Sequence, residues 1–466
     1  MAGRRLVNPA SGPRHGIGGH GSNFEVIATR LYREAQHPAS GRYRYTVCLA
    51  TLPSAMTKAV AEAAATAELR QGLEWFARAK QWINDRHLEL CRIPAPTFFE
   101  QARAEWMQAQ FRDLGYEARI DRTGNVVASA PGYEDGPVVA VTAHLDTVMA
   151  PQNPEKEITL EPDGKFHGPG VSDNGAGLSA LLAMAKAAQV CGAAMFRPLV
   201  FVANVGEEGE GNLSGMRYLC RQSPLSSRLA ALLVLDGPAT DHITCQALAS
   251  RRFDINITGP GGHSWSDYGI GNPVHALSRA IALFTDTPLN GAGSPRSSFN
   301  FGLVQGGLSI NSIAGSARAK LDIRSENVAR LEELSGILTT CVEKAVEVEN
   351  DRASGGRVSA RITDIGTRPG GKLADDADIL NILRAVDAHL AIRARIDCAS
   401  TDANIPLSMG MPAVAIGAGG QGGGAHTPGE WYNPEGRDLG LRRILLALYL
   451  LARDTALRGG PAGLDE

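Results

Sequence analysis

The sequence predicts an α/β fold in which a mainly parallel sheet forms one domain and a smaller α+β domain with a four-stranded antiparallel sheet interrupts it. Three continuous apolar runs, residues 138–143, 198–205 and 231–236, have the pattern of strands buried on both faces. Residues 177–189 have the pattern of a helix between two of these runs, as expected where neighbouring strands are parallel. From about residue 247, apolar and polar residues alternate, which is typical of one-sided antiparallel strands.

Residues 1–55 differ from the rest of the 466-residue chain. They are rich in Gly, Ser and Arg, poor in acidic residues, and show no sustained periodicity. Such a segment is typical of a transit peptide or of a leader that is disordered or outside the fold, and we expect the second. Met56 opens a strongly helical stretch that continues to Ile83, so we expect the folded part to begin there.

The interrupting domain is predicted from the alternating segments and from two helix-like stretches near residues 273–286 and 326–347. Buried-strand character returns at residues 412–419. Residues 444–452 are expected to form a terminal core helix that is too short to span a membrane. We therefore expect one domain split around another. The expected boundaries are a leader at 1–55, a first domain made of 56–246 and 366–466, and the interrupting domain at 247–365.

The composition excludes several classes of partner. The chain has a net charge of −3 and 20% charged residues, with no excess of either sign that would attract nucleic acid or an anionic membrane. Its seven cysteines are widely spaced and form no C-x-x-C pair, so neither a disulfide framework nor a thiolate zinc site is indicated. These features favour a reducing, cytoplasmic setting.

Metal-competent side chains follow the buried strands. His144 comes directly after the first apolar run, Glu207 and Glu208 follow the second, and Asp236 ends the third. The loop after a fourth such run carries His426. Ligands of open parallel sheets bind beyond the carboxyl ends of the strands, so we expect these side chains to converge although they are far apart in the sequence.

Asp173 lies in the segment GPGVSDNGAG, directly before the predicted helix, whose N-terminus favours an anionic group. The segment lacks the glycine spacing and the lysine of nucleotide-binding loops, so a nucleotide site is not expected. Taken singly, a histidine after a strand is commonly a hydrogen-bonded loop residue, and a Glu-Glu pair is commonly a solvated turn. Together, five hard or borderline ligands at one sheet edge predict a metal centre.

Charge counting predicts two cations. Two divalent cations bring +4, and Asp173, Glu208 and Asp236 supply −3, so one hydroxide between the metals would neutralise the site and act as the nucleophile. Imidazole and carboxylate ligands without thiolate suit zinc, with cobalt or manganese as substitutes. Asp146 lies two residues after His144, on the same face of an extended chain, and can accept the second ring N–H of that histidine.

Glu207 neighbours a predicted ligand and is free to act as the general base, which takes a proton from the attacking water and hands it to the leaving amine. The sequence thus predicts amide hydrolysis. A serine hydrolase is not indicated because the chain has no G-x-S-x-G motif, and no cysteine lies in a recognisable nucleophile context. A non-catalytic protein that keeps the fold would be expected to lack a ligand or the base, and none is missing.

Five segments, AHLDTV, GPGVSDNGAG, NVGEEGEG, LVLDG and GGGAHTPGEW, follow one another in an order that resembles a known family. From about residue 56 to the C-terminus the chain resembles the di-zinc aminoacylase/carboxypeptidase family, the twentieth family of metallopeptidases. Its members include peptidase T, glutamate carboxypeptidase, acetylornithine deacetylase and succinyl-diaminopimelate desuccinylase. The resemblance implies a zinc-peptidase catalytic domain with Asp146 orienting His144 and Glu207 as catalytic base. It also implies two metals with the following ligands: His144 and Asp236 on one, Glu208 and His426 on the other, and Asp173 bridging them.

The same resemblance implies that the interrupting domain is a lid that commonly dimerises. A histidine in a GGHS-like turn of such lids reaches into the partner's active site and stabilises an oxyanion. Here the segment GPGGHSW offers His263, for which an ordinary turn histidine is the alternative. Asn311 and Arg324 match the family's substrate-contacting residues, and an arginine can bind a carboxylate through two parallel hydrogen bonds. His275 is expected in packing or at the surface, and Asp402 is expected to support the metal pocket.

We therefore expect a homodimeric, zinc-dependent metallopeptidase or amidohydrolase that acts on a small peptide or an N-acyl amino acid, with no nucleic-acid or membrane partner. The segments AHLDT and GGGAHTPGEWY look more like those of the family's peptidase branch, and this resemblance favours an exopeptidase that acts on di- or tripeptides. The alternative is an N-acyl-amino-acid deacylase or desuccinylase with the same metal chemistry.

Overall fold

The computed structural model describes residues 54–133, 135–289 and 294–458. Residues 1–53, which make up nearly all of the expected leader, lie outside the described part of the chain. The helical stretch predicted from Met56 forms three consecutive helices: α1 (Ser54–Ala65), α2 (Ala67–Arg78) and α3 (Lys80–Cys91). Helix α2 buries Leu69, Leu73 and Phe76, which lie on one face because they are spaced three or four residues apart.

The large sheet has the strand order β1-β2-β6-β3-β7-β17-β8-β15, and β16 pairs with β8. The four central strands β6, β3, β7 and β17 are parallel, whereas β1, β2 and β15 join the sheet in antiparallel pairs. The predicted parallel sheet is therefore confirmed at its centre, and its edges are mixed. The bounds are β1 (Glu117–Ile120), β2 (Val126–Ser129), β3 (Val138–His144), β6 (Leu199–Asn204), β7 (Leu229–Leu235), β8 (His242–Ala247), β15 (Gly371–Lys372), β16 (Arg395–Ala399) and β17 (Ala413–Ile416).

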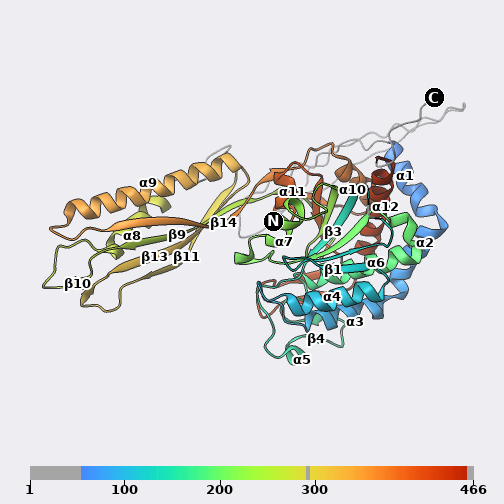
Figure 1. Cartoon of the computed structure of the whole chain (residues 1–466), viewed down its shortest axis with the longest axis horizontal. Helices are drawn as coiled ribbons and strands as arrows, with labels where there is room; N and C mark the ends of the chain where they lie inside the picture. The colour runs from blue at the N-terminus through green and yellow to red at the C-terminus, as the bar shows by residue number, and fades with distance from the viewer. Residues whose placement is uncertain (1–53, 134, 290–293, 459–466) are drawn as a thin grey trace, which may run out of the picture. The chain divides into compact units, whose positions relative to one another are not determined.

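Helix α6 (Gly175–Cys191) packs against the central strands, and α12 (Arg437–Arg458) packs against both α6 and β3 (Figure 1). The start of α6 allows only small residues, because a Cβ atom on Gly175 would lie 2.6 Å from the carbonyl oxygen of Gly170. The side chain of Asn174 caps the helix by accepting the N–H of Gly177 at 3.0 Å. The remaining helices of this domain are α4 (Gln101–Asp113), α5 (Pro154–Glu157), α7 (Ser214–Arg221), α10 (Asp378–His389) and α11 (Asn404–Ser408).

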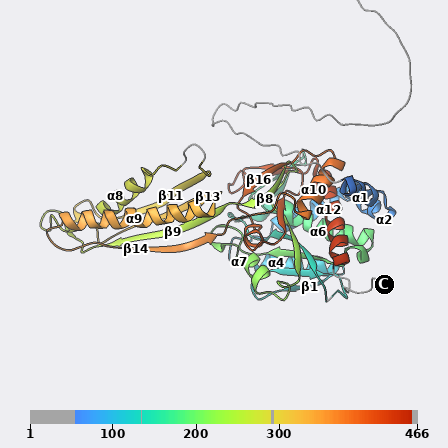
Figure 2. The same ribbon diagram turned by 90° about the horizontal axis from the view of Figure 1, so that it is seen from above.

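The interrupting domain, called the lid below, contains a four-stranded antiparallel sheet in the order β11-β13-β9-β14. Its strands are β9 (Ala249–Thr258), β11 (Ser297–Gly306), β13 (Ser316–Ser325) and β14 (Ser359–Arg368). Helices α8 (Pro273–Thr285) and α9 (Val328–Arg352) pack on this sheet (Figure 2). The lid has its own hydrophobic cluster, separate from that of the large sheet. We propose the domain boundaries expected from the sequence, with β14 running slightly past residue 365.

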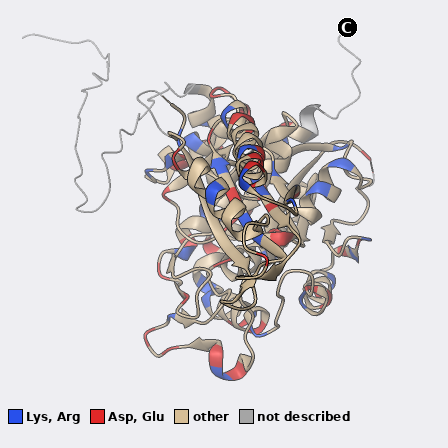
Figure 3. Ribbon diagram, turned by 90° about the vertical axis from the view of Figure 1, so that its left-hand side faces the viewer, with Lys and Arg blue, Asp and Glu red and all other residues tan. Residues whose placement is uncertain are grey.

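Two small sheets complete the described fold. β10 (Gly262–His263) pairs with β12 (Ser312–Ile313) in the lid, and the other sheet has the order β18-β19-β5-β4. Its strands are β18 (Gln421–Gly423), β19 (Trp431–Asn433), β5 (Phe166–His167) and β4 (Thr159–Leu160). Basic and acidic residues are interspersed along the ribbon (Figure 3), in keeping with the small net charge of −3. No helix in the described ranges has the length and apolar character needed to span a membrane.

Candidate metal centre and active site

The five residues predicted as metal ligands lie at the ends of elements that meet at one sheet edge. His144 is the last residue of β3, Asp236 directly follows β7, and Glu208 lies in the loop after β6. Asp173 precedes α6, and His426 lies in the loop between β18 and β19 with a φ of 64°. The carboxyl ends of parallel strands point to the same edge of the sheet, which explains why residues far apart in the sequence converge here.

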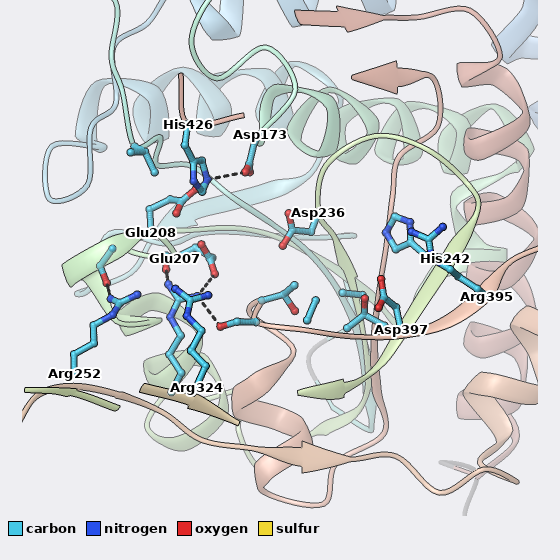
Figure 4. A pocket seen from close by; sticks show the side chains of 18 residues that line it. Asp173, Glu207, Glu208, Asp236, His242, Arg252, Arg324, Arg395, Asp397 and His426 are labelled. Atoms are coloured by element: carbon cyan, nitrogen blue, oxygen red, sulfur yellow. Dashed lines mark hydrogen bonds and ion pairs between the residues drawn. The ribbon is translucent and has the colours of Figure 1, made fainter. Parts of the chain in front are cut away.

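Short distances link these side chains. Nε2 of His144 lies 3.1 Å from Oδ1 of Asp173 and 4.0 Å from Oδ1 of Asp236. Nε2 of His426 lies 3.1 Å from Oδ2 of Asp173 and 2.9 Å from Oε1 of Glu208. Asp173 thus presents one carboxylate oxygen to each histidine, and Figure 4 shows it beside His426.

The donor set fits two divalent cations. Two groups of three residues that share Asp173 have ligand atoms within 4.8 Å of one another: His144, Asp173 and Asp236 form one, and Asp173, Glu208 and His426 form the other. A third group of this kind consists of His144, Glu207 and Glu208. Asp173 is common to the first two groups, as a bridging carboxylate would be. Imidazole nitrogen and carboxylate oxygen are ligands that zinc, cobalt and manganese accept.

The electrostatics of the site also fit bound cations. Burial, followed by the nearby Glu207, raises the pKa of Glu208 to about 7. Burial and the carboxylate of Asp173 raise the pKa of Asp236 well above its ordinary range. A hydrogen bond to Asp173 raises the pKa of His426 to about 9. These acids are desolvated and crowded by like charges, and divalent cations would offset both effects.

Asp146 is completely buried and fastens the loop that carries the two glutamates. Its Oδ1 accepts the backbone N–H of Glu207 and its Oδ2 that of Glu208, each at 2.9 Å. The predicted contact with His144 is made mainly by the backbone. Nδ1 of His144 donates to the carbonyl oxygen of Asp146 at 2.9 Å, and the Oδ1 of that residue is 3.6 Å away. Because a carbonyl only accepts, Nδ1 carries the hydrogen and Nε2 is left free toward the metal centre.

Glu207 is buried and is paired with an arginine that the sequence did not single out. Oε1 of Glu207 accepts a hydrogen bond from Nη1 of Arg368 at 2.9 Å, and Nη2 of Arg368 donates to the Glu207 carbonyl. Burial raises the pKa of Glu207, and the charge of Arg368 opposes this rise. Oε2 of Glu207 accepts no hydrogen bond from the described residues, which leaves it available to a proton of the reactants. The general-base role expected for Glu207 stays a prediction at this point.

Arg324 lines the cavity that contains the metal cluster. The cavity has a volume of about 470 Å³ and is also lined by Arg252 and Arg368. Arg252 and Arg324 share one carboxylate, since Nε of each donates to an oxygen of Asp322, at 3.1 and 2.7 Å respectively. A guanidinium anchored through Nε keeps its terminal nitrogens free, as the predicted substrate contact of Arg324 requires.

His263 and Asn311 lie together at the far end of the lid sheet and do not line this cavity. Both are exposed, and the N–H of Ser264 donates to the carbonyl of Asn311 at 3.0 Å. Nδ1 of His263 accepts the backbone N–H of Trp265 at 3.2 Å, so Nε2 is the nitrogen that can reach another molecule. His275 lies on α8, where Nη2 of Arg352 donates to its Nδ1 at 2.9 Å, a surface position.

Asp402 lies behind the metal cluster and is fully buried. Its Oδ2 accepts a hydrogen bond of 2.6 Å from Asn204, the residue that pairs with His144 across β3 and β6. Burial, and then the charge of Glu207, raises the pKa of Asp402 to about 7. Asp402 thus contacts the end of β6, the strand beside the one that carries His144, and its expected supporting role stays a prediction.

Sequence reasoning missed Glu430, which fixes the loop of Asp173. The buried carboxylate of Glu430 accepts three backbone N–H groups: those of Ser172 at 2.7 Å, Asp173 at 2.8 Å and Gly170 at 2.8 Å. Glu430 follows His426 by four residues in the Gly-rich motif. A glutamate in a loop gives no sequence signal for such a contact, because its partners lie more than 250 residues away.

Replacing Glu430 by glutamine should loosen the Asp173 loop. The amide NH₂ would face the N–H of Gly170, and a buried donor left without an acceptor costs about 1–3 kcal/mol. We expect E430Q to unfold at a lower temperature and to bind Zn²⁺ more weakly, measured by calorimetry and by metal titration. The control is E435Q, at an exposed position in the following loop. Equal metal affinity in E430Q and the control would contradict the assigned role.

Comparison with known proteins relates the chain to one family of peptidases. The model of peptidase family M20/M25/M40 matches residues 140–449. An uncharacterized protein, YqjE of Bacillus subtilis, is 24% identical over 347 residues, which cover 72% of this chain and 89% of that protein. The cytosol non-specific dipeptidase of Escherichia coli is 28% identical over 224 residues, 42% of this chain and 46% of that enzyme.

Solved structures share the fold. A tripeptidase of Staphylococcus aureus has a TM-score of 0.65 at 21% identity, covering 80% of this chain and 98% of the other. The YXEP protein of Bacillus subtilis, described as a dinuclear metal-binding peptidase of family M20, has a TM-score of 0.59 at 17% identity and covers 80% and 98% of the two chains. With the family model matched over most of the chain, this protein is a hydrolytic enzyme that belongs to peptidase family M20/M25/M40.

Proposed function

We propose that this enzyme is a two-metal exopeptidase that cleaves an amide bond in di- or tripeptides. The observation that carries the proposal is the pair of ligand groups that share Asp173, with Glu207 beside them in the same cavity. The likeness to a tripeptidase structure and to a dipeptidase sequence supports peptides as substrates. The likeness to a succinyl-diaminopimelate desuccinylase and to an acetylornithine deacetylase supports the alternative, an N-acyl-amino-acid substrate. Zinc is the metal we propose, because the donors are nitrogen and oxygen without sulfur.

His144 and Asp236 would hold one cation, Glu208 and His426 the other, and Asp173 both. Such cations, when bound, supply Lewis acidity that acidifies water and polarises a carbonyl group. Glu207 takes the proton of the attacking water on Oε2 and then delivers it to the leaving nitrogen. Arg368 holds the other oxygen of Glu207 in place, so the base keeps one orientation during both transfers. Arg324 binds the terminal carboxylate of the leaving amino acid.

We also propose a homodimer in which the lid completes the partner's site. Trp265, Leu308 and Ile310 are almost fully exposed and lie within three residues of His263 or Asn311 in the sequence. A cluster of exposed apolar side chains is typical of a protein interface. Because His263 and Asn311 do not line the cavity of their own chain, a second copy is the source from which they would reach a bound substrate. His263 would stabilise the oxyanion that develops on the attacked carbonyl.

Mixed dimers test this arrangement directly. The H263A variant should lose about 10²–10³-fold in kcat, the usual effect of removing one oxyanion donor. Mixing H263A with E207A chains should restore roughly a quarter of the wild-type activity, since half of randomly formed dimers are mixed and each has one complete site. Activity that stays at the level of the separate variants would show that His263 does not act on the partner.

A substrate panel tests the proposed activity. The Zn²⁺-loaded enzyme is assayed with di- and tripeptides and with acetyl- and succinyl-amino acids. We expect hydrolysis of the peptides. Exclusive turnover of the acylated compounds would instead assign a deacylase or desuccinylase with the same metal chemistry.

The cytoplasmic setting expected from the sequence stays a proposal. All six cysteines in the described ranges have free thiols, which is consistent with a reducing compartment.

A further inference from the structure

The cavity of the metal cluster continues into a second region that the proposed mechanism does not use. Four polar side chains line it, called the polar arm here: His242, Thr244, Arg395 and Asp397. Figure 4 shows Asp236 between the arm and the side of the cavity that carries Arg324. The residues of the arm belong to β8 and β16, at one edge of the large sheet.

The register of these two strands builds the arm. β16 pairs with β8 in parallel, with Arg395 opposite His242 and Asp397 opposite Thr244. Alternate residues of β8 point to opposite faces, so Ile243 and Cys245 belong to the hydrophobic core while His242 and Thr244 line the cavity. Thr244 lies at the bottom of this face and is only 3% exposed. All four polar side chains therefore share one face of a strand pair.

The charged residues of the polar arm differ in whether they have an ion-pair partner. Arg395 is already paired, because its Nη1 donates to Oδ2 of Asp241 at 2.7 Å, and Asp241 does not line the cavity. His242 is bound to the same aspartate, with its Nδ1 3.2 Å from Oδ1. Asp397 forms no ion pair with any described residue. From the described part of the chain its carboxylate accepts one hydrogen bond, from the backbone N–H of Cys398 to Oδ1, at 2.8 Å. One carboxylate of the arm is thus left without a cation.

The distance between the polar arm and the metal cluster determines which part of a substrate can contact the arm. β17 separates β8 from β7, the strand that leads to Asp236, so β8 lies roughly 10 Å from β7 at the usual strand spacing. β16, which carries Asp397, lies on the other side of β8 and is therefore roughly 14 Å from β7. A group at this distance cannot touch the cleaved bond. It can touch a long side chain of the residue that supplies the carbonyl, or the end of one further residue, since an extended chain advances about 3.3–3.6 Å per residue.

We propose that the polar arm is a subsite for a protonated amine on the carbonyl side of the cleaved bond. Asp397 accepts a charge-assisted hydrogen bond from the amine, and the hydroxyl of Thr244 beside it accepts another. Arg324, on the opposite side of Asp236, is the proposed partner of the leaving group's carboxylate, so a substrate with an amine at one end and a carboxylate at the other fits the charges of the cavity. This inference rests on the proposed peptidase function.

The amine can come from a lysine side chain or from the amino terminus of a tripeptide, and matched substrates separate the two. The first series is Lys-Ala, norleucyl-Ala and Glu-Ala. The second is Gly-Gly-Ala with a free and with an acetylated amino terminus. For the Zn²⁺-loaded wild type we expect kcat/KM to be about tenfold higher for the substrate that carries the amine than for its uncharged match, in at least one of the two series. A factor of about ten corresponds to one hydrogen bond to a charged group.

Variants of Asp397 then test the assignment. D397N should lower kcat/KM about tenfold, chiefly through KM, for the amine substrate alone and leave its uncharged match unchanged. D397K places a cation in the arm and should therefore have a higher kcat/KM for Glu-Ala than for Lys-Ala. The control is D376N, at an exposed position outside the cavity. T244V is a second variant, with a smaller expected loss on the amine substrate.

The outcomes are distinguishable. A wild type that hydrolyses all peptides without preferring the amine, or a D397N variant that weakens every substrate by the same factor, would overturn the subsite and leave the proposed peptidase function standing. Failure of the metal-loaded wild type to hydrolyse any peptide would overturn both.

Discussion

The E207A variant is expected to lose about 10²–10⁴-fold in kcat, the range typical of a general base. Glu207 is buried beside the cluster, its Oε1 is held by Arg368, and its Oε2 has no partner among the described residues. Removing the carboxylate removes the acceptor for the proton of water and the donor for the leaving nitrogen. KM should change much less than kcat, because the proton transfers occur only in the reaction itself.

Metal content separates this loss from damage to the centre. In the proposed assignment Glu207 is not a metal ligand, although it forms a group of neighbouring ligand atoms with His144 and Glu208. E207A should therefore retain its two cations per chain, measured by elemental analysis. E207D is the conservative companion, which keeps a carboxylate but withdraws it by one methylene. We expect E207D to recover part of the activity. Wild-type turnover in E207A would refute the assignment of the base.

Removal of the metals is the second change with a large expected effect. A strong chelator should abolish activity, and Zn²⁺ added back should restore it. The melting temperature should fall by several degrees, because a cation present at about 100 times its Kd stabilises the folded state by about 2.7 kcal/mol. An enzyme that keeps its activity after exhaustive chelation would contradict the proposed mechanism.

The effect of chelation should depend on pH. The pKa of Glu208 is raised by burial to about 7, and that of His426 is raised by Asp173 to about 9. Raised values mean that the folded, metal-free protein binds protons more tightly than the unfolded chain. Their contribution to the free energy of unfolding is complete below the ordinary pKa of each group and is lost as the pH rises through about 7 and about 9. The difference in melting temperature between metal-loaded and metal-free protein should therefore widen from pH 5 to pH 9.

The sequence predicted those parts of the fold that have long, regular patterns. The apolar runs that became β3, β6 and β7, and the alternating segments of the lid, gave clear signals because each spans six residues or more. The sheet that carries His426 gave none, since β18 and β19 have three residues each and β4 and β5 only two. Strands this short contain no period that a sequence pattern can reveal.

The candidate site divides in the same way. Residues placed at strand ends by the chain's own periodicity, such as His144 and Asp236, could be predicted to converge. The contacts of Glu430 and Arg368 could not, because their partners are set by how distant segments meet in three dimensions. The contacts of Asp146 also differ from the one that was predicted. Its side chain binds the glutamate loop while its carbonyl holds the histidine, and a residue pattern does not distinguish carbonyl from carboxylate.

The three hydrogen bonds between Glu430 and the Asp173 loop have a consequence for the synthesis of the protein. Residues 173 and 430 are 257 positions apart, so the ribosome adds the second on the order of tens of seconds after the first at 5–20 residues per second. Until then the loop has no acceptor for its three N–H groups, and the bridging carboxylate has no fixed place. A nascent chain that has not yet reached residue 426 therefore cannot assemble the proposed two-cation site, because both His426 and the carboxylate that fixes the Asp173 loop are still missing.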